Sequence, residues 1–174
     1  MQRAGAVRDR LPFRAINRAA DPGYEPGMQR HHLLPLQLLS SRWFGAMFVR
    51  LGRERVGFDD FRRNGLLLPC SDRTAVRLGL PLHRGPHRDY NAMVFERVGQ
   101  IEHGWAARRL RTPDDALEEA LMRLTLLQQA LRRRLLADRR RLLLNRADPL
   151  GAGRDFAELD AMAELLWRQT GKAE

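Results

Sequence analysis

The sequence predicts a mostly helical α+β fold, and three observations support this prediction. Apolar residues recur at helical spacing over most of the chain. The clearest strand signal is short: Asn64-Gly65 is a typical turn, and the apolar run Leu66–Leu68 that follows ends at Pro69. The chain has 174 residues, of which 44% are hydrophobic. This is enough for one domain with a core, or for one domain with a helical appendage.

Helices are predicted on both sides of this strand. The first 27 residues show no clear period and predict an irregular arm. Pro35 fits the first turn of a helix whose apolar pattern continues to Leu51, and Gly52 then ends it. Beyond the strand, Pro86 fits the first position of a helix that runs through YNAMVFERVGQIE to about residue 102.

The last third of the sequence predicts a C-terminal αα-hairpin. Thr112 is a suitable cap and Pro113 a suitable first residue for a long amphipathic helix that ends near Asn145. Asp155 and Glu158 then form a second capping box, which opens another helix. We expect this hairpin to pack on the preceding part of the chain or on a partner.

The charge of the chain suits a nucleic-acid partner. The formal net charge is +10, and 30 of the 31 basic residues are arginine. The planar guanidinium suits phosphate, and a basic surface suits nucleic acid. A GC-rich genome would produce the same arginine bias, so the charge alone does not decide the function.

The chain lacks the marks of several other protein classes. Cys70 is the only cysteine, which excludes a disulfide framework and a cysteine-based zinc ribbon. The N-terminus has no apolar run typical of a signal peptide, and no 18-residue apolar stretch occurs anywhere. We therefore expect a soluble protein.

Four of the five histidines fall in two clusters, His31-His32 and His83 with His87. Imidazole is a common ligand of divalent metals, although a lone histidine is more often structural. Pro86 predicts His83 just before a helix and His87 in its first turn, and the spacing of the two residues allows both to face one ion if the chain between them is tightly turned. Neighbouring side chains point in different directions, so if His31 faces the ion, His32 is free to act as a general base.

Three segments carry a resemblance to a known family. RHHLLPLQLL, DDFRRNGLLLP and GLPLHRGPHRDYNAMV occur in this order within residues 28–100. Together they resemble the AHH branch of the HNH (His-Me finger) nucleases. The resemblance implies a ββα-metal core with the histidine pair on a first short strand or loop, Leu66–Leu68 on the next strand, and the helix over 86–102.

The resemblance also implies a role for each matching residue. His31 matches a metal ligand, and His32 matches the catalytic general base. Asn64 matches a catalytic-site asparagine that braces the loop carrying the base. His83 and His87 match the pair that completes the metal site. One divalent ion (Mg, Mn, Zn or Ni) is implied, and three imidazoles suit Zn or Ni better than Mg.

Residues around these motifs are further candidates. Arg30 stands where the family has a small residue, and it is a candidate for contact with nucleic acid. Arg84 and Arg88 flank the second histidine cluster and are candidate phosphate contacts. Asp59 and Asp60 lie near the site in sequence, and we interpret them as solvated turn residues.

The expected organisation has three parts: an irregular arm over 1–27, a nuclease core over 28–103 and a helical extension over 104–174. The resemblance implies a metal-dependent endonuclease that cleaves DNA rather than RNA and largely ignores sequence. It further implies a bacterial toxin or effector with a cognate immunity protein. Its expected location is the bacterial cytoplasm, or, without a signal peptide, the cytoplasm of a target cell. The starting Met and the residues after the core leave open a free-standing effector, an excised fragment or a nuclease for another task.

Two alternatives stay open at this point. The first is a non-catalytic nucleic-acid-binding or docking module held together by zinc. Closed zinc sites take four protein ligands, however, and here only His32 or a distant residue is left as a fourth. The second makes the C-terminal helices the functional part, as a docking surface for a secretion-system component.

Overall fold

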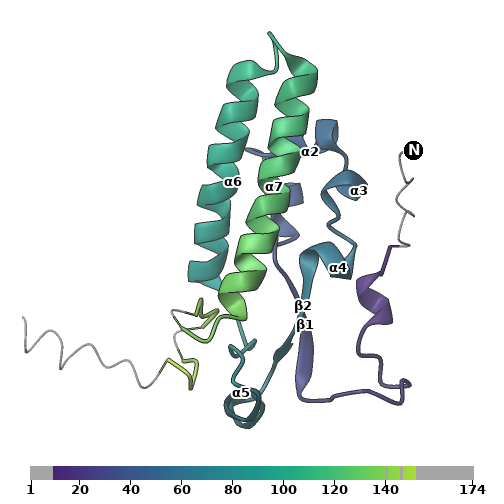
Figure 1. The fold of residues 1–174 in the computed structure, drawn as a ribbon, viewed down its shortest axis with the longest axis vertical. Helices are drawn as coiled ribbons and strands as arrows, with labels where there is room; N and C mark the ends of the chain where they lie inside the picture. Colours follow the sequence, from purple (N-terminus) through teal and green to yellow (C-terminus); the bar gives the residue numbers. More distant parts are fainter. Residues whose placement is uncertain (1–9, 140, 146, 152–174) are drawn as a thin grey trace, which may run out of the picture.

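The computed structural model describes residues 10–139, 141–145 and 147–151 (Figure 1). A short 3-10 turn, Phe13–Ala15, comes first, and two strands and seven α-helices follow within these residues. In chain order the elements are β1 (Met28–His32), α1 (Gln37–Ser40), α2 (Gly45–Leu51), α3 (Arg53–Val56), α4 (Phe61–Asn64), β2 (Gly65–Pro69), α5 (Asp72–Leu78), α6 (Arg88–Arg108) and α7 (Pro113–Leu135).

The two strands form an antiparallel sheet in which His31 pairs with Leu66 and His32 pairs with Gly65. Helices α1 to α4 lie between the strands in the chain, so Asn64-Gly65 is not a hairpin turn. Asn64 is instead the last residue of α4, and Gly65 begins β2 directly. The predicted strand over Leu66–Leu68 and the predicted mostly helical α+β class are both confirmed.

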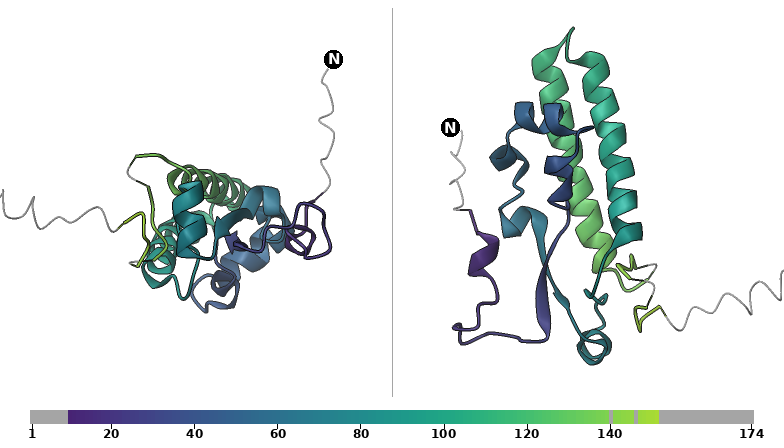
Figure 2. Two further views of the ribbon diagram at one scale, coloured as in Figure 1. Left: turned by 90° about the horizontal axis from the view of Figure 1, so that it is seen from below. Right: turned by 180° about the vertical axis from the view of Figure 1, so that it is seen from behind.

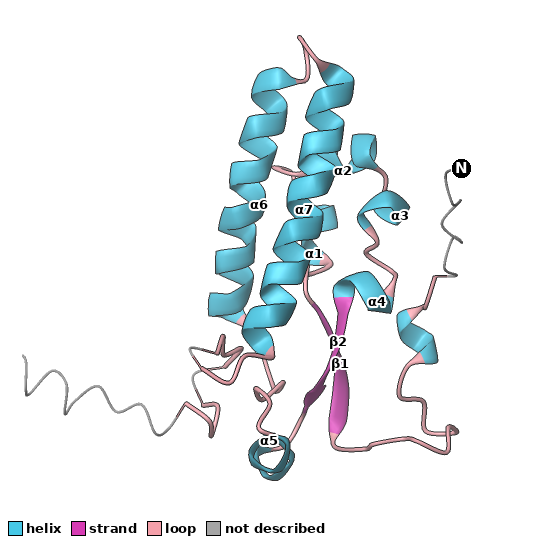
Figure 3. Cartoon of the chain, in the orientation of Figure 1, coloured by secondary structure: helices cyan, strands magenta, loops and turns pink. Residues whose placement is uncertain are grey.

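The longest elements, α6 and α7, form an antiparallel helical hairpin (Figure 3). It differs from the predicted C-terminal hairpin, whose second helix from residue 155 lies outside the described residues. Helix α7 also ends at Leu135 rather than near Asn145. The chain then folds back, and the Leu142 N–H donates to the Arg134 carbonyl at 2.9 Å.

The sequence predicts one continuous helix over 35–51. This prediction is wrong, because the structure divides the segment into α1 and α2. Ser41 ends α1 with an extended backbone (ψ 125°), and its hydroxyl accepts a hydrogen bond from the Trp43 N–H at 3.3 Å. Serine side chains that bond nearby backbone groups compete with the helical pattern. The apolar spacing persists across this break, and for that reason the pattern alone predicts one helix.

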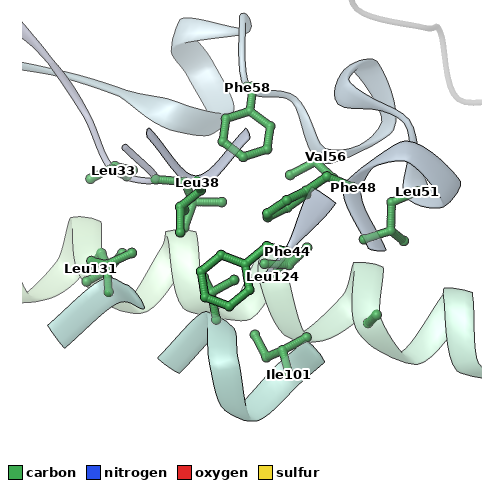
Figure 4. Close-up of a cluster of buried hydrophobic side chains, with 14 of the residues drawn as sticks. Leu33, Leu38, Phe44, Phe48, Leu51, Val56, Phe58, Ile101, Leu124 and Leu131 are labelled. Atoms are coloured by element: carbon green, nitrogen blue, oxygen red, sulfur yellow. The ribbon is translucent and has the colours of Figure 1, made fainter. Parts of the chain in front are cut away.

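The hydrophobic core lies between the α6–α7 hairpin and the segment from β1 to α4 (Figures 2 and 4). Phe44 and Phe58 from that segment are buried with Ile101 of α6 and Leu124 of α7. Helix α7 therefore contributes to the core that supports the sheet. Helix α6 runs across the boundary expected at residue 103, and the three-part division stays a prediction. No helix in the described part of the chain is long and apolar enough to cross a membrane.

Candidate active site

Three histidines from two segments of the chain meet beside the sheet. His31 lies on β1, His83 in the loop between α5 and α6, and His87 directly before α6. One ring nitrogen from each lies within 4.8 Å of the others. The ring centroid of His31 is 5.1 Å from that of His83 and 5.6 Å from that of His87. The fold thus gathers the three residues that the sequence suggests as metal ligands.

The electrostatics of the cluster favour neutral imidazoles. Burial, reinforced by the neighbouring histidines, lowers the pKa of His31 to about 2. Burial also lowers the pKa of His83 to about 4 and, to a lesser extent, the pKa of His87. Neutral imidazole is the form that binds metals.

Two ring nitrogens of the cluster are buried without a hydrogen-bond partner in the described part of the chain. They are Nε2 of His31 and Nδ1 of His87. A buried polar atom without a partner costs free energy, so such atoms are uncommon. A divalent ion bound between the rings would give both nitrogens a partner, and the cluster therefore fits a metal ion.

Gln29 orients one of the three rings. Its Oε1 lies 3.1 Å from Nδ1 of His83, which donates to it as the carbonyl oxygen can only accept. This bond leaves Nε2 of His83 free as the ligand atom, and such partners are typical of metal-binding histidines. Sequence reasoning missed Gln29, although strand alternation places it on the same face of β1 as His31.

Tyr90 of α6 supports the cluster from the core. Its hydroxyl donates to the Leu33 carbonyl at 2.7 Å, and its ring meets His31 edge to face at 5.0 Å. Burial raises the pKa of this phenol, so the hydroxyl stays protonated. Tyr90 is therefore a buried core residue with a hydrogen-bond partner.

His32 lies beside the cluster but has a different environment. Its ring stacks on Phe13 with centroids 3.8 Å apart and planes 5° apart. Burial lowers the pKa of His32, whereas the carboxylate of Asp59 opposes this shift. Phe13 belongs to the segment predicted as an irregular arm, and no local sequence pattern indicates its contact with His32.

One pocket of about 280 Å³ joins His32 to the three clustered histidines. The rest of its lining comes from Arg30 and from residues of the adjoining segments, namely Pro35, Leu36, Gln37 and Asn91. A candidate base and a candidate metal site therefore open into the same space.

Asn64 connects the segment after the histidine pair to two other parts of the fold. Its Nδ2 donates to the carbonyls of Leu34 and Phe58, both at 3.2 Å. Its Oδ1 accepts from the Leu34 N–H at 2.7 Å and from Gln128 of α7 at 3.3 Å. The side chain is fully buried and is not part of the lining of the pocket that His32 shares with the clustered histidines, so it joins backbone segments instead of facing that pocket.

The three predicted phosphate contacts have different surroundings. Arg30 lines the pocket, and its guanidinium donates to the Phe13 carbonyl at 3.0 Å. Arg84 forms an ion pair with Asp72 at 3.2 Å. Arg88 is exposed at the first position of α6. Their contact with nucleic acid stays a prediction.

The two aspartates near the site are not simple solvated turn residues. Both are half-buried. Asp59 pairs with Arg53, and Asp60 caps α4 by accepting from the Arg62 N–H at 3.1 Å. Asp60 also accepts from the Leu11 N–H at 3.3 Å, which ties the N-terminal segment to the site.

Replacing Gly65 with alanine is expected to destabilise the protein by about 1–3 kcal/mol, the usual cost of overpacking. A Cβ there would overlap the ring of Phe61, which packs edge to face on Phe13 at 5.2 Å. Urea denaturation measures the change. Gly99→Ala is the matched control, because its Cβ would meet only Phe44 at 3.9 Å. Equal stabilities of the two variants would contradict the prediction.

Comparison with known protein families identifies a nuclease family. A model of the family described as "AHH: A nuclease family of the HNH/ENDO VII superfamily with conserved AHH" matches residues 13–131, which is more than half of the chain. No curated protein and no solved structure matches significantly. The matched region includes β1, β2, α6 and all three clustered histidines. The chain therefore belongs to the AHH family of endonucleases within the HNH/ENDO VII superfamily.

Proposed function

We propose that this endonuclease uses His31, His83 and His87 to hold one divalent ion and His32 as its general base. The observation that carries the proposal is the three-imidazole cluster with partnerless ring nitrogens, which shares a pocket with His32. Within the described residues, the group that could hold a metal has three members. A closed structural zinc site takes four protein ligands, so this set favours an open catalytic site.

Each group then has a distinct task in hydrolysis. When bound, the ion supplies Lewis-acid stabilisation of the negative charge that develops on the scissile phosphate. His32, kept neutral by its burial, accepts a proton from the water whose oxygen bonds to phosphorus, while the P–O bond to the 3′-oxygen breaks and that oxygen leaves and takes a proton from solvent. The stack on Phe13 limits rotation of the His32 ring, so its ring nitrogens keep their directions.

DNA is the substrate that we propose, with little dependence on base sequence. Arg30 lines the pocket, and Arg84 and Arg88 are next to His83 and His87 in the sequence. All three suit contacts with the phosphate backbone, which carries no sequence information. A formal net charge of +10 favours such contacts. Cleavage should therefore slow steeply as the salt concentration rises.

We also propose the biological setting of a bacterial toxin that acts in the cytoplasm of a target cell. An acidic immunity protein would complement the basic charge of the chain. The C-terminal helices, of which α7 lies within the described residues, are the proposed docking surface for a secretion component.

The test is cleavage of supercoiled plasmid DNA, and of RNA in parallel, by purified protein. We expect nicking and linearisation with Mg, Mn, Zn or Ni, none in excess chelator, and recovery when the ion is restored. Faster cleavage of DNA than of RNA supports the substrate assignment. Cleavage that persists in chelator after exhaustive dialysis would contradict the metal requirement, and intact DNA and RNA with every ion would contradict the proposed function.

A further inference from the structure

The loop that carries two of the three clustered histidines has no regular structure of its own. Residues 79–87 form neither helix nor strand, and Gly85 has a φ of +74°. Within the loop, the His83 N–H donates to the Pro69 carbonyl of β2 at 2.6 Å. The position of His83 therefore depends on bonds from the loop to its surroundings.

Two of these bonds come from a segment far along the chain, residues 141–145 and 147–151. Asp148 Oδ2 accepts from the Leu82 N–H at 2.6 Å. The side-chain amide of Asn145 donates to the Arg84 carbonyl, also at 2.6 Å. The backbone is thus held immediately before and immediately after His83.

The segment itself is ordered by its own contacts. Asp148 is only 1% exposed, and its Oδ1 accepts from the Leu150 N–H at 2.9 Å. Asn145 Oδ1 accepts from the Ala147 N–H at 2.9 Å, and Leu144 is buried in the core. Figure 2 shows this yellow-green segment beside the end of the helical hairpin where α6 begins.

We propose that Asp148 and Asn145 are positioning residues for the metal centre, and together we call them the loop clamp. The inference rests on the proposed function, because it assumes that His83 binds the ion. It goes beyond the family assignment, since both residues follow the matched region 13–131. Without the loop clamp, the backbone around His83 has more conformational freedom. Metal binding must then order this part of the loop, and the lost conformational entropy weakens the binding.

The test measures Co(II) affinity of the full-length chain by its visible absorption, together with hydrogen exchange in the loop. Asp148→Ala and Asn145→Ala should each weaken Co(II) binding about 10–100-fold, as for other residues that orient metal ligands. Exchange of the Leu82 amide should accelerate in Asp148→Ala. Asp148→Asn, which keeps one acceptor oxygen, should recover part of the affinity. Asp138→Ala is the matched control, because that side chain is fully exposed in the same part of the chain.

The outcomes separate this inference from the proposed function. Unchanged Co(II) affinity in folded clamp variants, even with lower thermal stability, would overturn the clamp. If Asp148→Ala does not fold, Asn145→Ala decides, because its side chain is only half-buried. A wild-type protein that binds Co(II) tightly but cleaves no nucleic acid would overturn the proposed function alone, whereas one that binds no Co(II) would overturn both.

Discussion

Replacing His32 with alanine is expected to slow phosphodiester cleavage about 10²–10⁴-fold, because the attacking water loses its proton acceptor. The fold should persist, since the ring is half-buried at the pocket and stacks on Phe13 rather than filling the core. Metal binding should also persist, because His31, His83 and His87 are unchanged. Single-turnover cleavage of plasmid DNA measures the rate, and Co(II) titration measures the metal affinity.

The matched control for this variant is His103→Ala. His103 is exposed on α6 and belongs to neither histidine cluster, so its loss should leave the rate unchanged. Cleavage by His32→Ala at the wild-type rate would remove His32 from the mechanism. A loss of rate that only follows a loss of Co(II) affinity would assign it to the metal site instead of to proton transfer.

The histidine cluster could be predicted from the sequence because short local patterns indicate its metal-binding residues. The spacing of His83 and His87 around Pro86 indicates a turn that leads into a helix, and the resemblance joins this element to the distant His31-His32 pair. The spacing of apolar residues over short segments likewise predicts that a strand or a helix is present. In these cases each signal lies within a few residues of the feature that it predicts.

The parts that could not be predicted depend on contacts between distant segments. Phe13 stacks on His32, and Asp148 reaches the Leu82 amide across 66 positions. Neither contact leaves a local pattern. The prediction that the long helix ends near Asn145 is wrong for a related reason. Leu144 continues an apolar run in the sequence, yet it is buried in the core outside any helix.

The second large effect is expected at Asn64, where replacement with alanine should lower the free energy of unfolding by about 3 kcal/mol or more. The variant leaves the N–H and C=O of Leu34 and the C=O of Phe58 without their side-chain partner in a fully buried place. Each buried group left unpaired costs about 1–3 kcal/mol. Since domains are stable by only about 5–15 kcal/mol, urea denaturation should show a large shift.

Two companion variants show whether the loss arises from this network. Asn91→Ala removes the same side chain from α6, where no hydrogen bond holds it within the described part of the chain, so its effect should stay within about 0.5 kcal/mol. Gln128→Ala removes a side-chain amide of α7, which donates to the Val56 carbonyl at 3.3 Å and forms the bond to Asn64 Oδ1, also at 3.3 Å. Because Asn64 and Gln128 share that bond, their double variant should be less destabilised than the sum of the single variants, by about 0.5–3 kcal/mol.

The activity of the folded Asn64→Ala protein then tests its link to the site. Leu33 and Leu34, which directly follow His32, are held by the carbonyl and the side chain of Asn64. Without the side chain, His32 should sample more orientations, and cleavage per folded molecule should slow while Co(II) affinity changes less. Full activity of the folded fraction would limit Asn64 to a role in stability. A stability equal to that of Asn91→Ala would contradict the network itself.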